Sequence, residues 1–196
     1  MKSFAVKGEP RTQTGKKANK AIRNNDSIPC VLYGKSDSIN FQTTEADLRH
    51  LVYSPDFQVV ELTVDNQTTR AILKDIQFHP VSDQIRHVDF LKLYDGVPVK
   101  VEIPLKTKGQ SPGVKVGGKL IQSVRRIKVK TLPEKLVDEL FIDISGMELG
   151  QSLRIKDIES VEGIEIMQNP SIPVVSIEIP RALRSAASAA TTDNKK

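Results

Sequence analysis

The side chains best suited to specific chemistry stand near the end of the first ninety positions. His79 lies in the segment 74–81, and His87 and Asp89 follow in the segment 85–90. Side chains alternate between two faces along a strand, so the sequence predicts that Ile85, His87, Asp89 and Leu91 share one face. Asp89 would then orient the imidazole of His87. Both groups can offer directional hydrogen bonds to base edges or to 2′-hydroxyls of RNA.

Other functions for these groups stay open from the residues alone. His79, His87 and Asp89 could ligate a metal, although their spacing matches no recognised ligand motif. His87 and Asp89 could form a catalytic pair, but no nucleophile is evident beside them. They could also be a structural pair within a sheet. Cys30 is the only cysteine and has apolar neighbours, which favours a buried strand residue over a thiol nucleophile or a disulfide.

A second candidate region is the segment 11–23, which mixes cations with small residues. Gly15 allows the backbone to approach an RNA strand closely. Lysine supplies non-directional charge and arginine a planar fork that suits phosphate or a guanine edge. The Gly-Lys pair lacks the upstream glycine and the following Ser or Thr of a Walker motif, so nucleotide hydrolysis is not indicated. The candidate phosphate contacts are Arg11, Lys16, Lys17, Lys20 and Arg23.

Charge is distributed unevenly along the 196 residues. Residues 1–35 carry eight Lys or Arg against Glu9 and Asp26, a balance of +6, whereas residues 36–96 carry five basic and ten acidic groups. Residues 97–180 are close to neutral, with twelve basic and eleven acidic groups. A cationic block is the electrostatic footprint of a nucleic-acid binder. A merely solvated basic arm is the alternative.

The elements that position these groups are mainly β-strands. Apolar and polar residues alternate in runs rich in Val, Ile, Leu and Phe, at 2–7, 28–33, 57–64, 70–78, 85–93, 99–106, 119–131, 140–144, 164–167 and 173–179. Short helices are predicted at 16–24 and 44–53, the second with Leu48, Leu51 and Val52 on one face. Residues 132–136 look like a helical turn.

Domain organisation follows from turn and composition signals. The Asp95-Gly96 turn within 94–98 predicts a boundary between domains at 1–94 and 95–180. The tail 181–196 has few large apolar groups and is predicted to be disordered. No run reaches the length of a membrane helix, and the N-terminus resembles no signal peptide, so we expect a cytoplasmic protein without membrane contact.

The order of motifs resembles the bacterial large-subunit ribosomal protein L25 family, in its long general stress protein CTC form. The resemblance in the first domain rests on Arg11, Gly15-Lys16, Arg23, the segment 28–34, Lys74-Asp75-Ile76-Gln77, His79-Pro80 and His87-Val88-Asp89-Phe90. Residues 112–114, 117–120, 144–147 and 150–153 extend it into the second domain.

This resemblance implies a fold and a function. The first domain would be a six-stranded β barrel with short helices, related to the anticodon-binding barrel of glutaminyl-tRNA synthetase, followed by a second antiparallel β domain. It would bind the loop E region of 5S rRNA in the central protuberance, as a monomer among neighbouring ribosomal proteins and rRNA, with neither enzymatic activity nor a cofactor. The positions that match those the family uses on RNA are Arg11, Arg23, Tyr33, His87 and Asp89.

The sequence departs from the family in two places. The first helix is often richer in Arg than residues 19–24 here, and Asp26-Ser27 replaces a common Gly-Lys turn. Both changes should weaken local phosphate contacts without removing the five matched residues. The leading rival function is a cytosolic stress-response module that binds another protein, and the third is a metal-dependent hydrolase.

Overall fold

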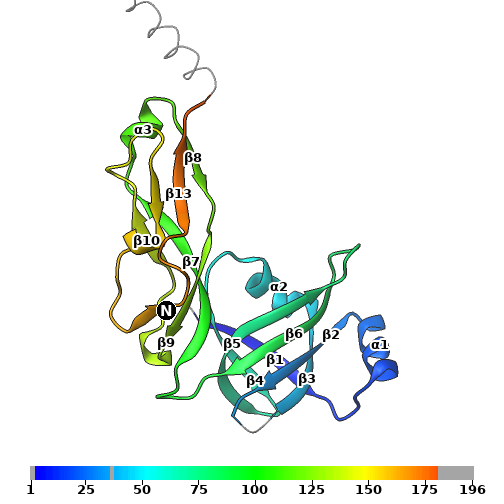
Figure 1. Cartoon of the computed structure of the whole chain (residues 1–196). Helices are drawn as coiled ribbons and strands as arrows, with labels where there is room; N and C mark the ends of the chain where they lie inside the picture. The colour runs from blue at the N-terminus through cyan, green and yellow to red at the C-terminus, as the bar shows by residue number, and fades with distance from the viewer. Residues whose placement is uncertain (1–2, 36–37, 181–196) are drawn as a thin grey trace, which may run out of the picture. The chain divides into compact units, whose positions relative to one another are not determined.

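A computed structural model of the chain describes residues 3–35 and 38–180 (Figure 1). The tail that the sequence predicts to be disordered, 181–196, lies outside the described residues. The expectation of a mainly β protein is confirmed. The chain forms two compact units: one runs as far as Val101 and takes in Thr131–Asp138, and the other is made of Glu102–Lys130 and the residues from Glu139 onward. The domain boundary near residue 95 stays a prediction.

The first unit contains a closed barrel with the strand order β1-β3-β2-β6-β5-β4. The β1–β4 and β2–β6 pairs are parallel, and the other pairs are antiparallel. Closure leaves no open edge for pairing with another chain. The barrel expected from the family resemblance is therefore present. Its strands are β1 (Ser3–Pro10), β2 (Ser27–Tyr33), β3 (Ser38–Thr44), β4 (Val59–Val64), β5 (Gln67–Phe78) and β6 (Ile85–Lys92).

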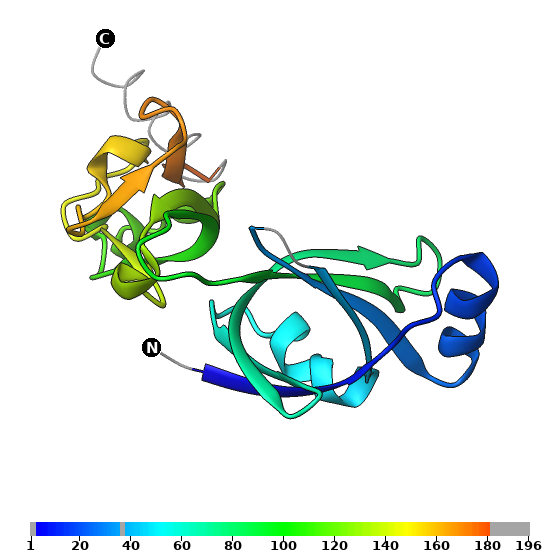
Figure 2. The same ribbon diagram turned by 90° about the horizontal axis from the view of Figure 1, so that it is seen from below.

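Two helices accompany the barrel, as the sequence predicts, with α1 at Lys16–Asn24 and α2 at Glu45–Tyr53. The side chain of Thr44 caps α2 by accepting a hydrogen bond from Asp47 N, which satisfies an otherwise unpaired donor of the first turn. Leu48 and Leu51 are buried in the barrel core. By contrast, α1 buries no residue. Figure 2 shows α2 across the barrel opening and α1 outside the ring of strands.

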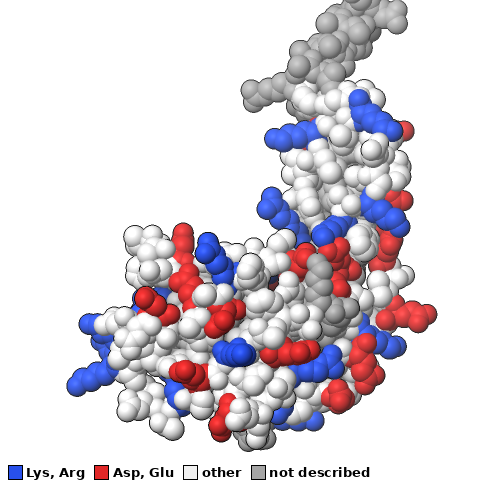
Figure 3. Space-filling view, turned by 180° about the vertical axis from the view of Figure 1, so that it is seen from behind, with Lys and Arg blue, Asp and Glu red and all other residues white. Residues whose placement is uncertain are grey.

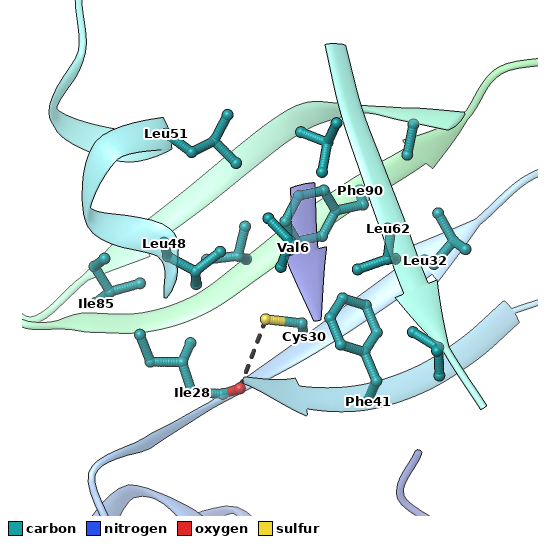
Figure 4. Close-up of a cluster of buried hydrophobic side chains, with 14 residues drawn as sticks. Val6, Ile28, Cys30, Leu32, Phe41, Leu48, Leu51, Leu62, Ile85 and Phe90 are labelled. Atoms are coloured by element: carbon teal, nitrogen blue, oxygen red, sulfur yellow. Dashed lines mark hydrogen bonds between the residues drawn. The ribbon is translucent and has the colours of Figure 1, made fainter. Parts of the chain in front are cut away.

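The barrel core is formed by inward side chains from every strand and from α2 (Figure 4). Phe41 and Phe90 are fully buried and their ring centroids lie 5.7 Å apart. Gly8 stands where a Cβ atom would overlap the ring of Phe41, so the absence of a side chain at this position lets β1 pass close to that ring. Burial of these groups supplies most of the unit's stability, because hydrophobic transfer is the dominant favourable contribution to folding.

Cys30 lies in this core, as the sequence predicts. Its side chain is fully buried, and Sγ donates to the Ile28 carbonyl at 3.6 Å. Burial, together with Asp89, raises the pKa of the thiol to about 12. A thiol held protonated in an apolar core is unsuited to nucleophilic attack.

We expect Cys30 to resist alkylation at pH 8 until the barrel unfolds. In the unfolded chain the thiol ionises more readily, because its pKa there is about 8.5. Its contribution to stability is therefore full below that pH and declines between about pH 8.5 and 12. Mass spectrometry after iodoacetamide treatment, with and without denaturant, tests the first point. A Cys30→Val variant has no thiol to ionise, so it should lose less stability than the parent as the pH rises above about 8.5. Rapid alkylation of Cys30 in the native parent would contradict its burial in the core.

The second unit consists of two small sheets. One has the order β10-β7-β9-β12 and the other the order β11-β13-β8. The expectation of a second β domain holds. The β11–β13 and β13–β8 pairs are antiparallel, as expected, whereas β10 pairs with β7 in parallel. The elements that follow the barrel strands are β7 (Val99–Lys108), α3 (Pro112–Lys115), β8 (Lys119–Gln122), β9 (Arg126–Thr131), the 3₁₀ turn η1 (Pro133–Lys135), β10 (Leu140–Asp143), β11 (Ser152–Arg154), η2 (Ile155–Asp157), β12 (Ile164–Ile166) and β13 (Pro173–Glu178). Of these, η1 lies within Thr131–Asp138 and belongs to the first unit.

The structure differs from the sequence prediction in a few elements. The predicted run 119–131 is two strands, β8 and β9, because the chain turns at residues 123–125, where Gln122 Nε2 donates to Leu105 O and Val124 O. Strand β3 was missed, since it buries only Phe41 and Thr43 and offers little apolar alternation. The short elements α3, β11 and η2 were also missed. The helical turn at 132–136 is present as η1.

Candidate nucleic-acid interface

His87 and Asp89 lie side by side on the outer face of β6, as the sequence predicts. His87 Nδ1 is 2.7 Å from Asp89 Oδ1, and both side chains are partly exposed. At this distance the carboxylate can orient the ring through Nδ1, and Nε2 is then the ring nitrogen that remains for a further hydrogen bond. Val88 and Phe90, on the opposite face, are buried in the barrel.

The predicted alternation fails at the start of β6. Gln77 pairs with His87 and the next pair is Phe78 with Ile85, so Arg86 has no partner on β5. This extra residue is a β-bulge, which reverses the facing of the residues before it. Ile85 is therefore buried in the core rather than sharing the face of His87. Arg86 is exposed beside His87.

Tyr33 ends β2, the strand that runs parallel to β6. Val31 pairs with Asp89 and Tyr33 with Leu91, so Tyr33 belongs to the same outer face as the His87–Asp89 pair. Partial burial, followed by the charges of Asp89 and Asp75, raises the pKa of the Tyr33 hydroxyl. Tyr33 therefore stays neutral at physiological pH and can donate as well as accept a hydrogen bond.

Helix α1 presents Lys16, Lys17 and Lys20 to solvent. Within residues 3–35 and 38–180, none of these lysines takes part in an ion pair or a side-chain hydrogen bond. Two of them stand in the first turn, which contains no acidic residue. The positive end of the helix dipole repels a lysine ammonium group at this position. Figure 3 shows Lys and Arg side chains protruding at the edge of the barrel unit where α1 lies.

The two arginines of this region are held by contacts within the protein. Arg11 Nη1 donates to Asn19 Oδ1 at 2.5 Å, and its backbone N–H donates to Asn40 O. Arg23 Nε and Nη2 donate to the Arg86 carbonyl at 3.2 and 3.1 Å. Partial burial and the charges of Arg86 and Arg11 lower the pKa of Arg23. Both guanidinium groups therefore have fixed orientations with donors still available.

Between α1 and the β5–β6 turn lies a groove of about 400 Å³, which we call the α1 groove. Its charged lining residues are Lys16, Lys20, Arg23, Arg86, Asp26 and Glu45. The sequence did not indicate Arg86. A signal was present in its position next to His87, but strict alternation placed it on the face opposite to that of His87.

The metal and hydrolase alternatives would need His79 to converge with His87 and Asp89. His79 instead holds its own turn, with Nδ1 accepting from Val81 N and Ser82 N. In the described part of the chain, no three His, Cys, Asp or Glu side chains gather as a metal site. No described helix has the length and apolar character to cross a bilayer. A barrel whose outer face joins an unpaired cationic helix to hydrogen-bonding side chains is typical of nucleic-acid-binding proteins.

Comparison with known proteins assigns the family. Residues 6–90 match the model of the ribosomal L25p family, and residues 98–181 match that of the ribosomal protein TL5 C-terminal domain. The chain is 44% identical over 189 residues to the large ribosomal subunit protein bL25 of Porphyromonas gingivalis, covering 95% of this chain and 98% of the relative. It is 42% identical to that of Bacteroides fragilis, covering 97% and 99%. With the protein of the same name from Amoebophilus asiaticus, it shares 37% identity over the whole of both chains.

The chain therefore belongs to the ribosomal L25p family. It is a ribosomal protein and not an enzyme.

Proposed function

We propose that this structural protein of the large ribosomal subunit binds 5S rRNA in its loop E region, within the central protuberance of the cytoplasmic ribosome. The observation that carries the proposal is the His87–Asp89 pair, with 2.7 Å between Nδ1 and Oδ1, on the same barrel unit as the unpaired cations of α1. The family supplies the ribosomal setting, and 5S rRNA is the partner that the sequence resemblance implies.

The two groups of residues have different roles in this proposal. Phosphate contacts carry no base information, so the charges of Arg11, Lys16, Lys17, Lys20 and Arg23 set affinity. Tyr33, His87 and Asp89 are directional and recognise edges or 2′-hydroxyls on the RNA. The second unit carries little net charge and contributes more to contacts within the subunit than to affinity for 5S rRNA.

Replacing Lys16 and Lys17 together with Ala should weaken binding to every RNA alike. Each phosphate contact releases condensed counterions, so the slope of log affinity against log salt should fall by about two. The measurement is filter binding of the full chain to 5S rRNA and to an unrelated duplex over a salt series. Preference for 5S rRNA should survive.

The matched control is the double variant Lys115→Ala and Lys119→Ala, which removes the same charge from exposed positions of the second unit. It should leave the slope nearly unchanged. If the two double variants had the same slope of log affinity against log salt, α1 would not be part of the RNA interface. A parent protein with no steep salt dependence would favour the rival function, a module that binds another protein.

A further inference from the structure

Arg86 owes its position to the bulge in β6. It is the one residue between the pairs Gln77–His87 and Phe78–Ile85 that lacks a partner on β5. Its carbonyl is the acceptor for both Nε and Nη2 of Arg23, a residue 63 positions away in the sequence. The bulge therefore does two things: it turns the Arg86 side chain outward, and it supplies an acceptor that orients a second guanidinium.

The α1 groove collects positive charge that the protein does not neutralise. Four cations line it, against Asp26 and Glu45. Across the described residues, no ion pair involves any of these six side chains. Like charges side by side in a concave surface repel one another, and a bound anion relieves that repulsion. His79, which also lines the groove, fixes the turn that forms one wall.

We infer that the α1 groove binds a backbone phosphate of the RNA, and that Arg86 contacts this phosphate while its carbonyl holds Arg23 in place as a second contact. This inference rests on the proposed function. The guanidinium fork suits a phosphate oxygen pair better than a point charge does. Arg86 and Asp89 are three residues apart on β6, so the phosphate and the recognised base edge lie roughly 10 Å apart along the strand.

The first test is Arg86→Gln in the full chain, with fluorescence anisotropy on 5S rRNA and on an unrelated duplex at several salt concentrations. Affinity should fall about tenfold on both RNAs at moderate salt, and the log–log salt slope should fall by about one. The matched control is Arg70→Gln, an exposed arginine near the opposite end of β5. That variant should bind within twofold of the parent, and circular dichroism establishes that both variants fold.

The second test separates orientation from charge. Arg23→Lys keeps the cation but cannot donate twice from a rigid fork to the Arg86 carbonyl. Affinity should fall about tenfold while the salt slope stays that of the parent. An Arg70→Lys variant, which makes the same substitution at an exposed arginine that does not line the α1 groove, should bind like the parent.

The outcomes distinguish this inference from the proposed function. If Arg86→Gln binds every RNA as tightly as Arg70→Gln does, and the parent still prefers 5S rRNA, then the α1 groove does not bind a phosphate and the proposed function stands. If the parent shows no preference for 5S rRNA, the proposed function fails. The loss of slope in Arg86→Gln would still report the phosphate contact, because such contacts are independent of RNA sequence.

Discussion

Replacing His87 with Ala is expected to weaken binding to 5S rRNA by about 5- to 150-fold, equivalent to about 1–3 kcal/mol, and to leave binding to an unrelated duplex nearly unchanged. The loss is specific because a desolvated group on the cognate RNA is left without its partner. Asp89→Ala should have a similar effect, since the imidazole 2.7 Å away loses the acceptor that orients it. Neither variant should change the salt slope, because no phosphate contact is removed.

The conservative variant Asp89→Asn tests the mechanism of this effect. The amide oxygen can still accept from His87 Nδ1, so binding should recover part of the way toward that of the parent. The measurement is competition filter binding with labelled 5S rRNA and unlabelled duplex. If the Ala variants fold normally, bind 5S rRNA as the parent does and lose a specifically bound metal, this strand face is a metal site and the proposed role is wrong.

Phe90→Ala should destabilise the barrel unit by about 3–5 kcal/mol, because it removes a fully buried ring and leaves a cavity beside Phe41. A unit of this size has a stability of about 5–15 kcal/mol, so the loss is a large fraction of the total. Its melting temperature should fall by at least about 12 °C. Differential scanning calorimetry or urea denaturation measures the change.

The control for this variant is Phe141→Ala, which removes the same side chain from a 39% exposed position of the second unit. It should lose much less unfolding free energy than Phe90→Ala does, because a partly exposed ring buries less apolar surface on folding. Similar losses for the two variants would contradict the assignment of Phe90 to the centre of the barrel core.

Much of the fold could be predicted from local pattern. Alternation identified strands with large apolar side chains on one face, and the Thr44 cap with Leu48 and Leu51 identified α2. Strand β3 was missed because its inward positions include Thr43, and its place in the barrel depends on pairing with β1 and β2. A strand with few apolar residues is specified by its neighbours rather than by its own sequence.

The kinds of residue in the candidate interface could likewise be predicted from the sequence, but their arrangement in space could not. His87 and Asp89 are two positions apart, and side chains alternate regularly from His87 onward, so the sequence placed these two side chains on one face. The same rule placed Ile85 and Arg86 on the wrong faces, because the bulge exists only where β5 and β6 pair. Register between strands is a property of the assembled barrel.

By itself, the sequence determined the mainly β class, the cationic first segment, the two barrel helices and the family. These follow from composition, from periodicity and from motifs within a few residues of one another. Only the tertiary structure decided that Arg23 is held by the Arg86 carbonyl, that Arg86 faces the α1 groove, and that Tyr33 shares a face with Asp89. Each of these relations joins residues more than fifty positions apart, which are brought together by the parallel pairing of β2 with β6 and by the packing of α1 beside them.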